Sequence, residues 1–127
     1  MSAWRREVLS RLPEFRDVIE QADDPMALWV ELFIPFEHAF RAGDHDLMRR
    51  VFQYAAWCLD TATDKATDAS TAAWCAFYED LPGVPGLVDQ LPQFLPWERF
   101  LRVEAALCES LDEKALARLR SSYPKRR

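Results

Sequence analysis

The sequence predicts an all-α protein, folded as a single compact bundle of about six helices. Apolar residues recur at spacings of three and four along most of the chain, which is the period of a half-buried helix. No segment alternates apolar and polar residues as a half-buried strand would. The chain has 127 residues, half of them hydrophobic, and only three glycines. This is enough for one domain with its own core, and too little glycine for a sandwich full of tight turns.

The first two helices are predicted on either side of Pro13. Residues 3–12 form the first, because a proline disfavours helical geometry in the residue before it. The second starts at Pro13 and ends at Asp23 and Asp24. Its half-buried stripe comprises Phe15, Val18, Ile19 and Ala22.

Asp24 and Pro25 predict the start of the third helix. An aspartate side chain can cap the free amides of a helix, and proline suits the first helical position. Gly43 predicts the end, because glycine adopts a left-handed cap without steric cost. We expect a kink at Pro35, which lacks a backbone donor. One face carries Trp29, Leu32, Phe33, Phe36 and Phe40.

The fourth and fifth helices follow. Asp44 begins the fourth, and the polar residues 60–70 are expected to form a loop. Ser70 is expected to cap a fifth helix over residues 71–81, which is apolar nearly all round and should therefore lie at the centre. The amphipathic stripe of the fourth helix comprises Leu47, Met48, Val51, Phe52, Ala55, Cys58 and Leu59.

Residues 82–86 predict a turn, and residues 87–95 look short and irregular. Pro96 opens the sixth helix, and a last helical pattern follows Leu111. The inward face of the sixth helix is predicted to comprise Trp97, Phe100, Leu101, Val103, Leu107 and Cys108.

The tetrapeptide Ala-Ala-Trp-Cys occurs at residues 55–58 and again at residues 72–75. One interpretation is the duplication of a two-helix unit, giving solenoid-like packing of helical hairpins. The other is coincidence, because cores are rich in small and aromatic residues. The sequence leaves both open.

Charge is distributed unevenly along the chain. Between Glu14 and Asp80 there are 14 acidic and five basic residues, and the whole chain has a net charge of −5. An acidic middle repels nucleic acid and attracts basic partners. No apolar run approaches the roughly 18 residues that span a bilayer, and the N-terminus lacks the apolar core of a secretory signal. We therefore expect a soluble, cytoplasmic protein with neither a nucleic-acid nor a membrane partner.

His38 and His45, with three nearby carboxylates, form a cluster of metal-type ligands. Gly43 is expected to break the helix between the two histidines, so the pair at i and i+4 that binds zinc on one helical face is absent. We expect neither a metal nor another cofactor. The acidic side chains beside the histidines are Glu37, Asp44 and Asp46.

Glu79 and Asp80 are the carboxylate pair that the sequence singles out. They follow an aromatic run at the predicted end of the fifth helix, where the helix dipole disfavours negative charge. A local salt bridge would also explain them. The three cysteines lie in apolar helical patterns and predict buried, reduced, inert thiols.

Residues 27–32, 49–59 and 75–82 resemble a family of small bacterial helical proteins without assigned activity, over about residues 25–100. The shared pattern is an aromatic-Ala-x-Trp-Cys helix, followed by Phe-Tyr-Glu-x-Leu-Pro at the end of the next. The family's histidine before Leu-Pro is Asp80 in this chain, which weakens a catalytic interpretation. The resemblance implies a one-domain helical protein, and some such proteins look like immunity proteins that accompany secreted toxins.

We therefore expect a binding protein and not an enzyme. The first hypothesis is an immunity protein that occludes a basic bacterial toxin. The alternatives are an adaptor or chaperone that holds an amphipathic peptide in a helical groove, and a small enzyme. The carboxylates predicted to meet the partner are Asp60, Asp64, Asp68, Glu79 and Asp80.

Overall fold

The computed structural model describes residues 2–61 and 67–124, with residues 67 and 68 described by their backbone alone. This part of the chain is mostly helical and contains no strand, which confirms the all-α class. Eight α-helices are present in it where the sequence predicts about six. They are α1 (Ala3–Arg11), α2 (Arg16–Gln21), α3 (Pro25–Ala42), α4 (His45–Asp60), α5 (Thr67–Ala76), α6 (Leu91–Phe94), α7 (Trp97–Leu107) and α8 (Glu113–Ser121). Three 3₁₀ segments join them, namely η1 (Pro13–Phe15), η2 (Tyr78–Gly83) and η3 (Val88–Gln90).

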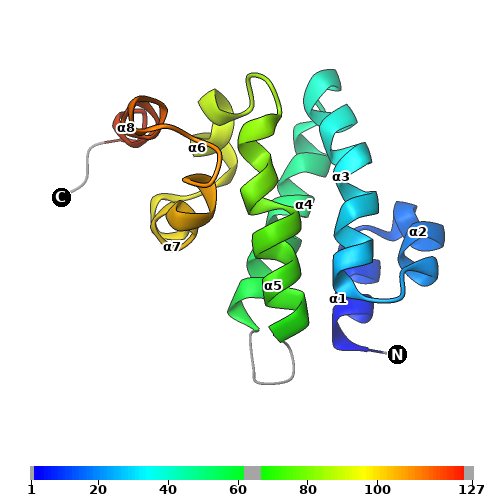
Figure 1. Cartoon of the computed structure of the whole chain (residues 1–127). Coiled ribbons are helices and arrows are strands. Elements are labelled where there is room, and N and C mark those ends of the chain that lie inside the picture. The colour runs from blue at the N-terminus through cyan, green and yellow to red at the C-terminus, as the bar shows by residue number, and fades with distance from the viewer. Residues whose placement is uncertain (1, 62–66, 125–127) are drawn as a thin grey trace.

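The centre of the molecule is formed by α3, α4 and α5, which all contact one another. Figure 1 shows α3 and α5 side by side with α4 behind them. On one side α1 packs on α4 and α2 packs on α3, and on the other side α6 and α7 cover α4 and α5. The bundle is therefore built outward from a three-helix centre.

Aspartate caps set the starts of α3 and α4 as the sequence predicts. The Asp24 carboxylate accepts a 2.8 Å hydrogen bond from the Ala27 amide, and Asp44 accepts one from the amide of Leu47. Gly43 ends α3 with a φ of +74°, a left-handed conformation that favours glycine. Between these caps α3 continues as one helix through Pro35.

The fifth helix differs from its prediction. It begins at Thr67 and ends at Ala76, so Ser70 lies inside it and is not its cap. Beyond Phe77 the chain tightens into η2, which contains Pro82. As predicted, α5 packs centrally, against α3, α4 and α7.

The Phe77 side chain is the hub of the core. Its ring lies 4.8 Å from that of Trp29, centroid to centroid, and 5.1 Å from that of Phe52. The side chains around it come from α3, α4 and η2. They are Trp29, Phe33, Phe36, Phe52 and Tyr78. Each such aromatic pair contributes roughly 0.5–1.5 kcal/mol beyond its buried area.

Candidate functional site

The outer face of α3 carries an exposed apolar stripe. Met26, Val30 and Ile34 are 39%, 58% and 55% exposed, and their spacing of four places them in one line along the helix. Only one other large apolar side chain among the described residues, Leu101, is comparably exposed, so the prediction that Leu101 faces inward on the sixth helix is wrong. The opposite face of α3 is buried in the core, so this helix is apolar on two sides.

Carboxylates border this stripe, Asp23 before its N-terminal end and Glu31 next to Val30. A shallow hollow of about 280 Å³ beside it is lined by Asp23, Ala27 and Glu31, together with residues of α2. Neither Asp23 nor Glu31 makes an ion pair with another described residue. We call the set of Asp23, Met26, Ala27, Val30, Glu31 and Ile34 the α3 face.

A second hollow of about 250 Å³ connects the α3 face to α5. It is lined by Asp24, Pro25, Met26 and Thr71. Asp24 accepts the hydrogen bond that caps α3, so its charge is engaged at the helix N-terminus. The stripe is thus flanked by two depressions, which a partner's side chains could enter.

Of the predicted partner-binding carboxylates, Asp60 is held by two arginines of the chain itself. Arg99 donates two hydrogen bonds of 2.8 Å, one to each oxygen, and Arg102 donates another. Arg102 also bonds the carbonyl of Leu59 at 2.7 Å. The hydrogen bond from Arg99 is the main reason that the pKa of Asp60 lies below its ordinary value. This cluster joins the end of α4 to α7.

The other predicted carboxylates are placed differently. Asp64 and the side chain of Asp68 lie outside the described residues. Glu79 is half-buried and Asp80 is exposed, and neither forms an ion pair with a described residue. They lie in the first turn of η2 and not in the last turn of α5, where the helix dipole would disfavour their negative charge. Among the described residues, neither Glu79 nor Asp80 joins the ion pairs that Asp60 makes with Arg99 and Arg102.

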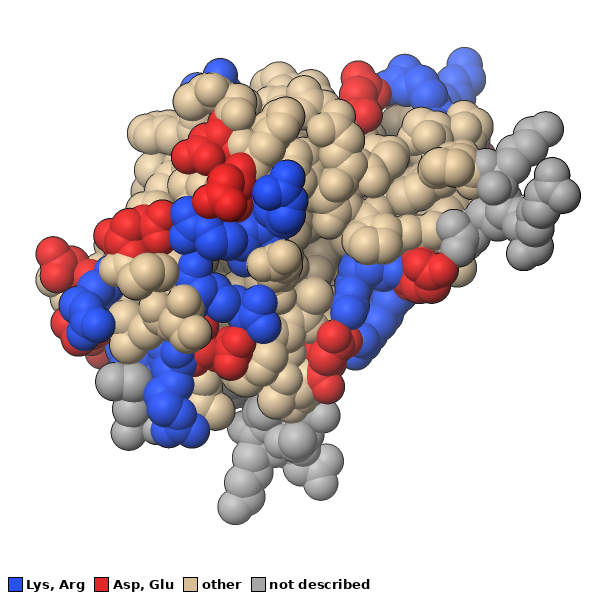
Figure 2. All heavy atoms as spheres, turned by 180° about the vertical axis from the view of Figure 1, so that it is seen from behind, with Lys and Arg blue, Asp and Glu red and all other residues tan. Residues whose placement is uncertain are grey.

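Some carboxylates of the acidic middle are paired with arginines of the chain itself. Figure 2 shows the face opposite that of Figure 1, where acidic and basic side chains lie next to each other. Among the described residues, five ion pairs join residues of the α1–α4 region: Glu7 with Arg11, Glu20 with Arg16, Glu37 with Arg41, and Glu14 and Asp46 with Arg50. The carboxylates available to attract a basic partner are therefore those that make no ion pair with another described residue.

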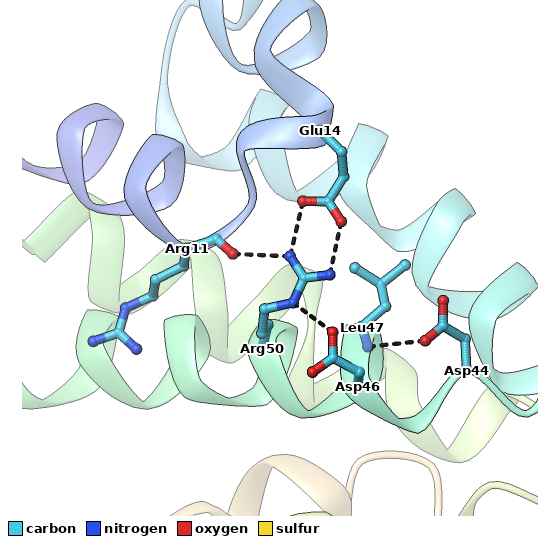
Figure 3. A network of polar contacts seen from close by, with 6 residues as sticks. All are labelled: Arg11, Glu14, Asp44, Asp46, Leu47 and Arg50. Carbon is cyan, nitrogen blue, oxygen red and sulfur yellow. Dashed lines mark hydrogen bonds and ion pairs between the residues drawn. The ribbon is translucent and has the colours of Figure 1, made fainter.

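Arg50 is the centre of one such network, shown in Figure 3. Its guanidinium donates to both oxygens of Glu14, to Asp46 at 3.1 Å and to the carbonyl of Arg11 at 3.0 Å. The hydrogen bond from Arg50 is the largest cause of the lowered pKa of Glu14. This geometry fastens η1 and the end of α1 to α4.

The histidines do not form a metal centre with neighbours in the described part of the chain. No group of three side chains there is placed to hold an ion. His38 is exposed on α3, and His45 begins α4, where its ring packs edge-on against Phe94 at 5.5 Å. The left-handed cap at Gly43 separates the two helices, as the sequence indicates.

The cysteines differ from one another. Cys58 is buried, and burial raises the pKa of its thiol to about 12. Cys75 and Cys108 are exposed, so the prediction of three buried thiols is wrong for these two. Desolvation is the first cause of the raised pKa of Cys75, followed by the charges of Glu79 and Asp80. A low-pKa reactive thiol is therefore not formed at this position.

Comparisons with family models, with curated proteins and with solved structures find no match for this chain. The resemblance to small bacterial helical proteins remains a hypothesis. None of the described helices combines the length and the apolar character needed to cross a bilayer.

The α3 face is the feature that the sequence analysis missed. Its signal is present in the sequence as three apolar residues four positions apart, Met26, Val30 and Ile34. A larger and more aromatic stripe on the same helix, which includes Trp29 and Phe36, hides that signal. In the structure, the stripe with the larger side chains is the one that faces the core.

Proposed function

We propose that this chain is a protein-binding domain that docks a basic protein on the α3 face, and that it acts as an immunity protein occluding a bacterial toxin. The observation that carries the proposal is the line of exposed Met26, Val30 and Ile34 beside carboxylates that make no ion pair with a described residue. Large apolar side chains gathered on the surface of a single domain mark interaction sites.

The arrangement matches the anatomy of a protein interface. Such interfaces have an apolar centre and a polar rim, and charges at the rim raise the association rate. Here the apolar line is the centre, and Asp23 and Glu31 supply rim charges that suit lysines or arginines of a partner. Association is then expected to slow as salt screens these charges.

Aromatic anchors would have to come from the partner. Trp29 is fully buried, and the other four tryptophans are only partly exposed and pack against the core. The hollows beside α3 offer places for such anchors. Both hollows are small and partly polar. An adaptor that holds a whole amphipathic helix needs a long apolar groove, so these hollows favour the docking of a folded protein surface.

The test is affinity capture with matched variants, followed by an inhibition assay. The double variant Val30→Lys, Ile34→Lys places positive charge at the centre of the α3 face, and Leu101→Lys changes an exposed apolar residue on α7 as the control. A basic protein captured by the wild type and the control, but not by the double variant, supports the proposal. When expressed in bacteria, that partner should arrest growth, and the wild-type chain should relieve the arrest while the double variant should not.

Equal capture by the double variant would show that the partner binds elsewhere. A partner that the double variant fails to capture, but that does not arrest growth, would support binding at the α3 face and contradict the immunity role.

A further inference from the structure

A third hollow lies between α4 and the segment that joins α6 to α7, and it shares no residue with the α3 face. Its volume is about 260 Å³. The residues that give it chemical character are Arg49, Phe52, Gln53, Phe94, Pro96 and Arg99. No lining residue is acidic, although the chain as a whole has a net charge of −5.

One wall of this hollow is apolar and aromatic. The rings of Phe52 and Phe94 are stacked, with 5.6 Å between their centroids and 13° between their planes. Phe94 is half-buried, so part of its ring is open to the hollow, and Pro96 extends the apolar wall. A flat apolar group could lie against these two side chains.

The other wall is cationic. Arg49 is exposed on α4 and forms no hydrogen bond or ion pair with any residue in the described ranges. Arg99 is paired with Asp60 through two N–H groups, which leaves three of its five donors for another acceptor. Because Arg102 also binds Asp60, the carboxylate is shared and the local charge stays positive.

We propose that this hollow binds a small organic anion made of one aromatic ring and a carboxylate. The ring would lie on Phe94 and Pro96, and the carboxylate would accept hydrogen bonds from Arg49 and Arg99. The volume of the hollow limits the size of the ligand, since pockets for drug-sized ligands are usually larger, from about 300 to 1,000 Å³. Planar guanidinium groups favour a carboxylate because they can donate two parallel hydrogen bonds to it.

The experiment follows backbone amide shifts by NMR while the wild-type protein is titrated with phenylacetate, and in parallel with the neutral phenylacetamide. Phenylacetate should shift amides of α4 and of residues 94–99, with a Kd on the order of 1 mM for so small a ligand. Phenylacetamide should bind about tenfold more weakly, because it lacks the charge that the arginines recognise.

Two variants and one control make the test specific. Arg49→Gln should weaken phenylacetate binding by about tenfold and leave phenylacetamide binding unchanged. Ala56→Phe, which fills the hollow from α4, should abolish binding of both compounds. Arg118→Gln changes a highly exposed arginine on α8 and should alter neither.

The proposal is overturned if phenylacetate produces no shifts around the hollow, if the neutral compound binds equally well, or if Arg49→Gln binds like the wild type. Arg49 is exposed and makes no ion pair with a described residue, so its variant should fold and keeps the test decisive even if Ala56→Phe fails to fold.

Discussion

The guanidinium of Arg50 and the carboxylate of Glu14 face each other through two hydrogen bonds, 2.8 and 2.7 Å long, between residues 36 positions apart. This pair joins the N-terminal helices to the central three. Both side chains are partly exposed, so solvent weakens the pair, and its contribution is about 1 kcal/mol.

Glu14→Gln should therefore lower the free energy of unfolding by about 1 kcal/mol at pH 7. The pKa of Glu14 in the fold lies below its ordinary value of 4.5. A group with a lowered pKa stabilises the fold above its unfolded pKa and loses that contribution as pH falls through the folded pKa. Urea unfolding should thus show a gap between wild type and variant that is full at pH 7 and shrinks below about pH 4.5. A gap that widens in acid would contradict the assignment.

Asp60→Asn should destabilise the protein by about 1 kcal/mol, because Arg99 and Arg102 would lose their shared carboxylate. Asp80→Asn is the control, since Asp80 is exposed and has no ion pair with a described residue. Thermal unfolding monitored by circular dichroism measures both. If the two variants melt together, the cluster contributes nothing to holding α7 on α4.

Val30→Lys should change stability by no more than about 0.5 kcal/mol, as is usual for exposed positions. Leu32→Ala, two residues away and 1% exposed, should cost about 2–5 kcal/mol through the cavity that it leaves. Urea denaturation of both variants tests which side of α3 faces the core. A severe loss with Val30→Lys would mean that the outer stripe is covered.

Tyr78→Phe should be close to neutral or slightly stabilising. The Tyr78 hydroxyl is buried without a hydrogen-bond partner in the described residues, and removing such a group relieves a desolvation penalty. Tyr123→Phe is the matched contrast, because that hydroxyl donates a 2.7 Å hydrogen bond to the carbonyl of Leu95 and its loss should cost about 1 kcal/mol. Equal losses in the two variants would indicate that Tyr78 has a partner after all.

Thiol labelling of the folded protein with dithiobis-nitrobenzoate should report two accessible cysteines, Cys75 and Cys108, while Cys58 reacts only on unfolding. Replacing Glu79 and Asp80 by their amides should speed the reaction of Cys75. Burial is the first cause of the raised pKa of Cys75 and the two charges add to it, so removal of the charges increases the thiolate fraction. Cys108 serves as the internal control. An unchanged Cys75 rate would show that these carboxylates do not act on the thiol.

The sequence was sufficient to predict the all-α class and the helix starts at Asp24, Asp44 and Pro96, because caps and prolines act locally. The end of the fifth helix was predicted wrongly, since the aromatic run at residues 77–78 continues the apolar pattern while the backbone has already changed.

Contacts between distant residues could not be predicted in the same way. Asp60 meets Arg99 and Arg102 across 39 and 42 positions, so its selection as a partner-binding residue could not take their charges into account. The exposure of Cys75 follows from the way in which α5 packs its alanines, Ala72, Ala73 and Ala76, inward and turns the thiol outward. Which face of a nearly uniform apolar helix is buried depends on its neighbours.

The position of Phe77 has a consequence for how the molecule comes apart. The residue lies between the end of α5 and the start of η2, and its ring contacts aromatic side chains of α3 and α4. Detaching any one of these segments removes contacts from the Phe77 ring. Partial opening at one segment therefore also weakens the packing of the others. The central helices are thereby expected to melt in one cooperative transition, without an intermediate in which a single helix has peeled away.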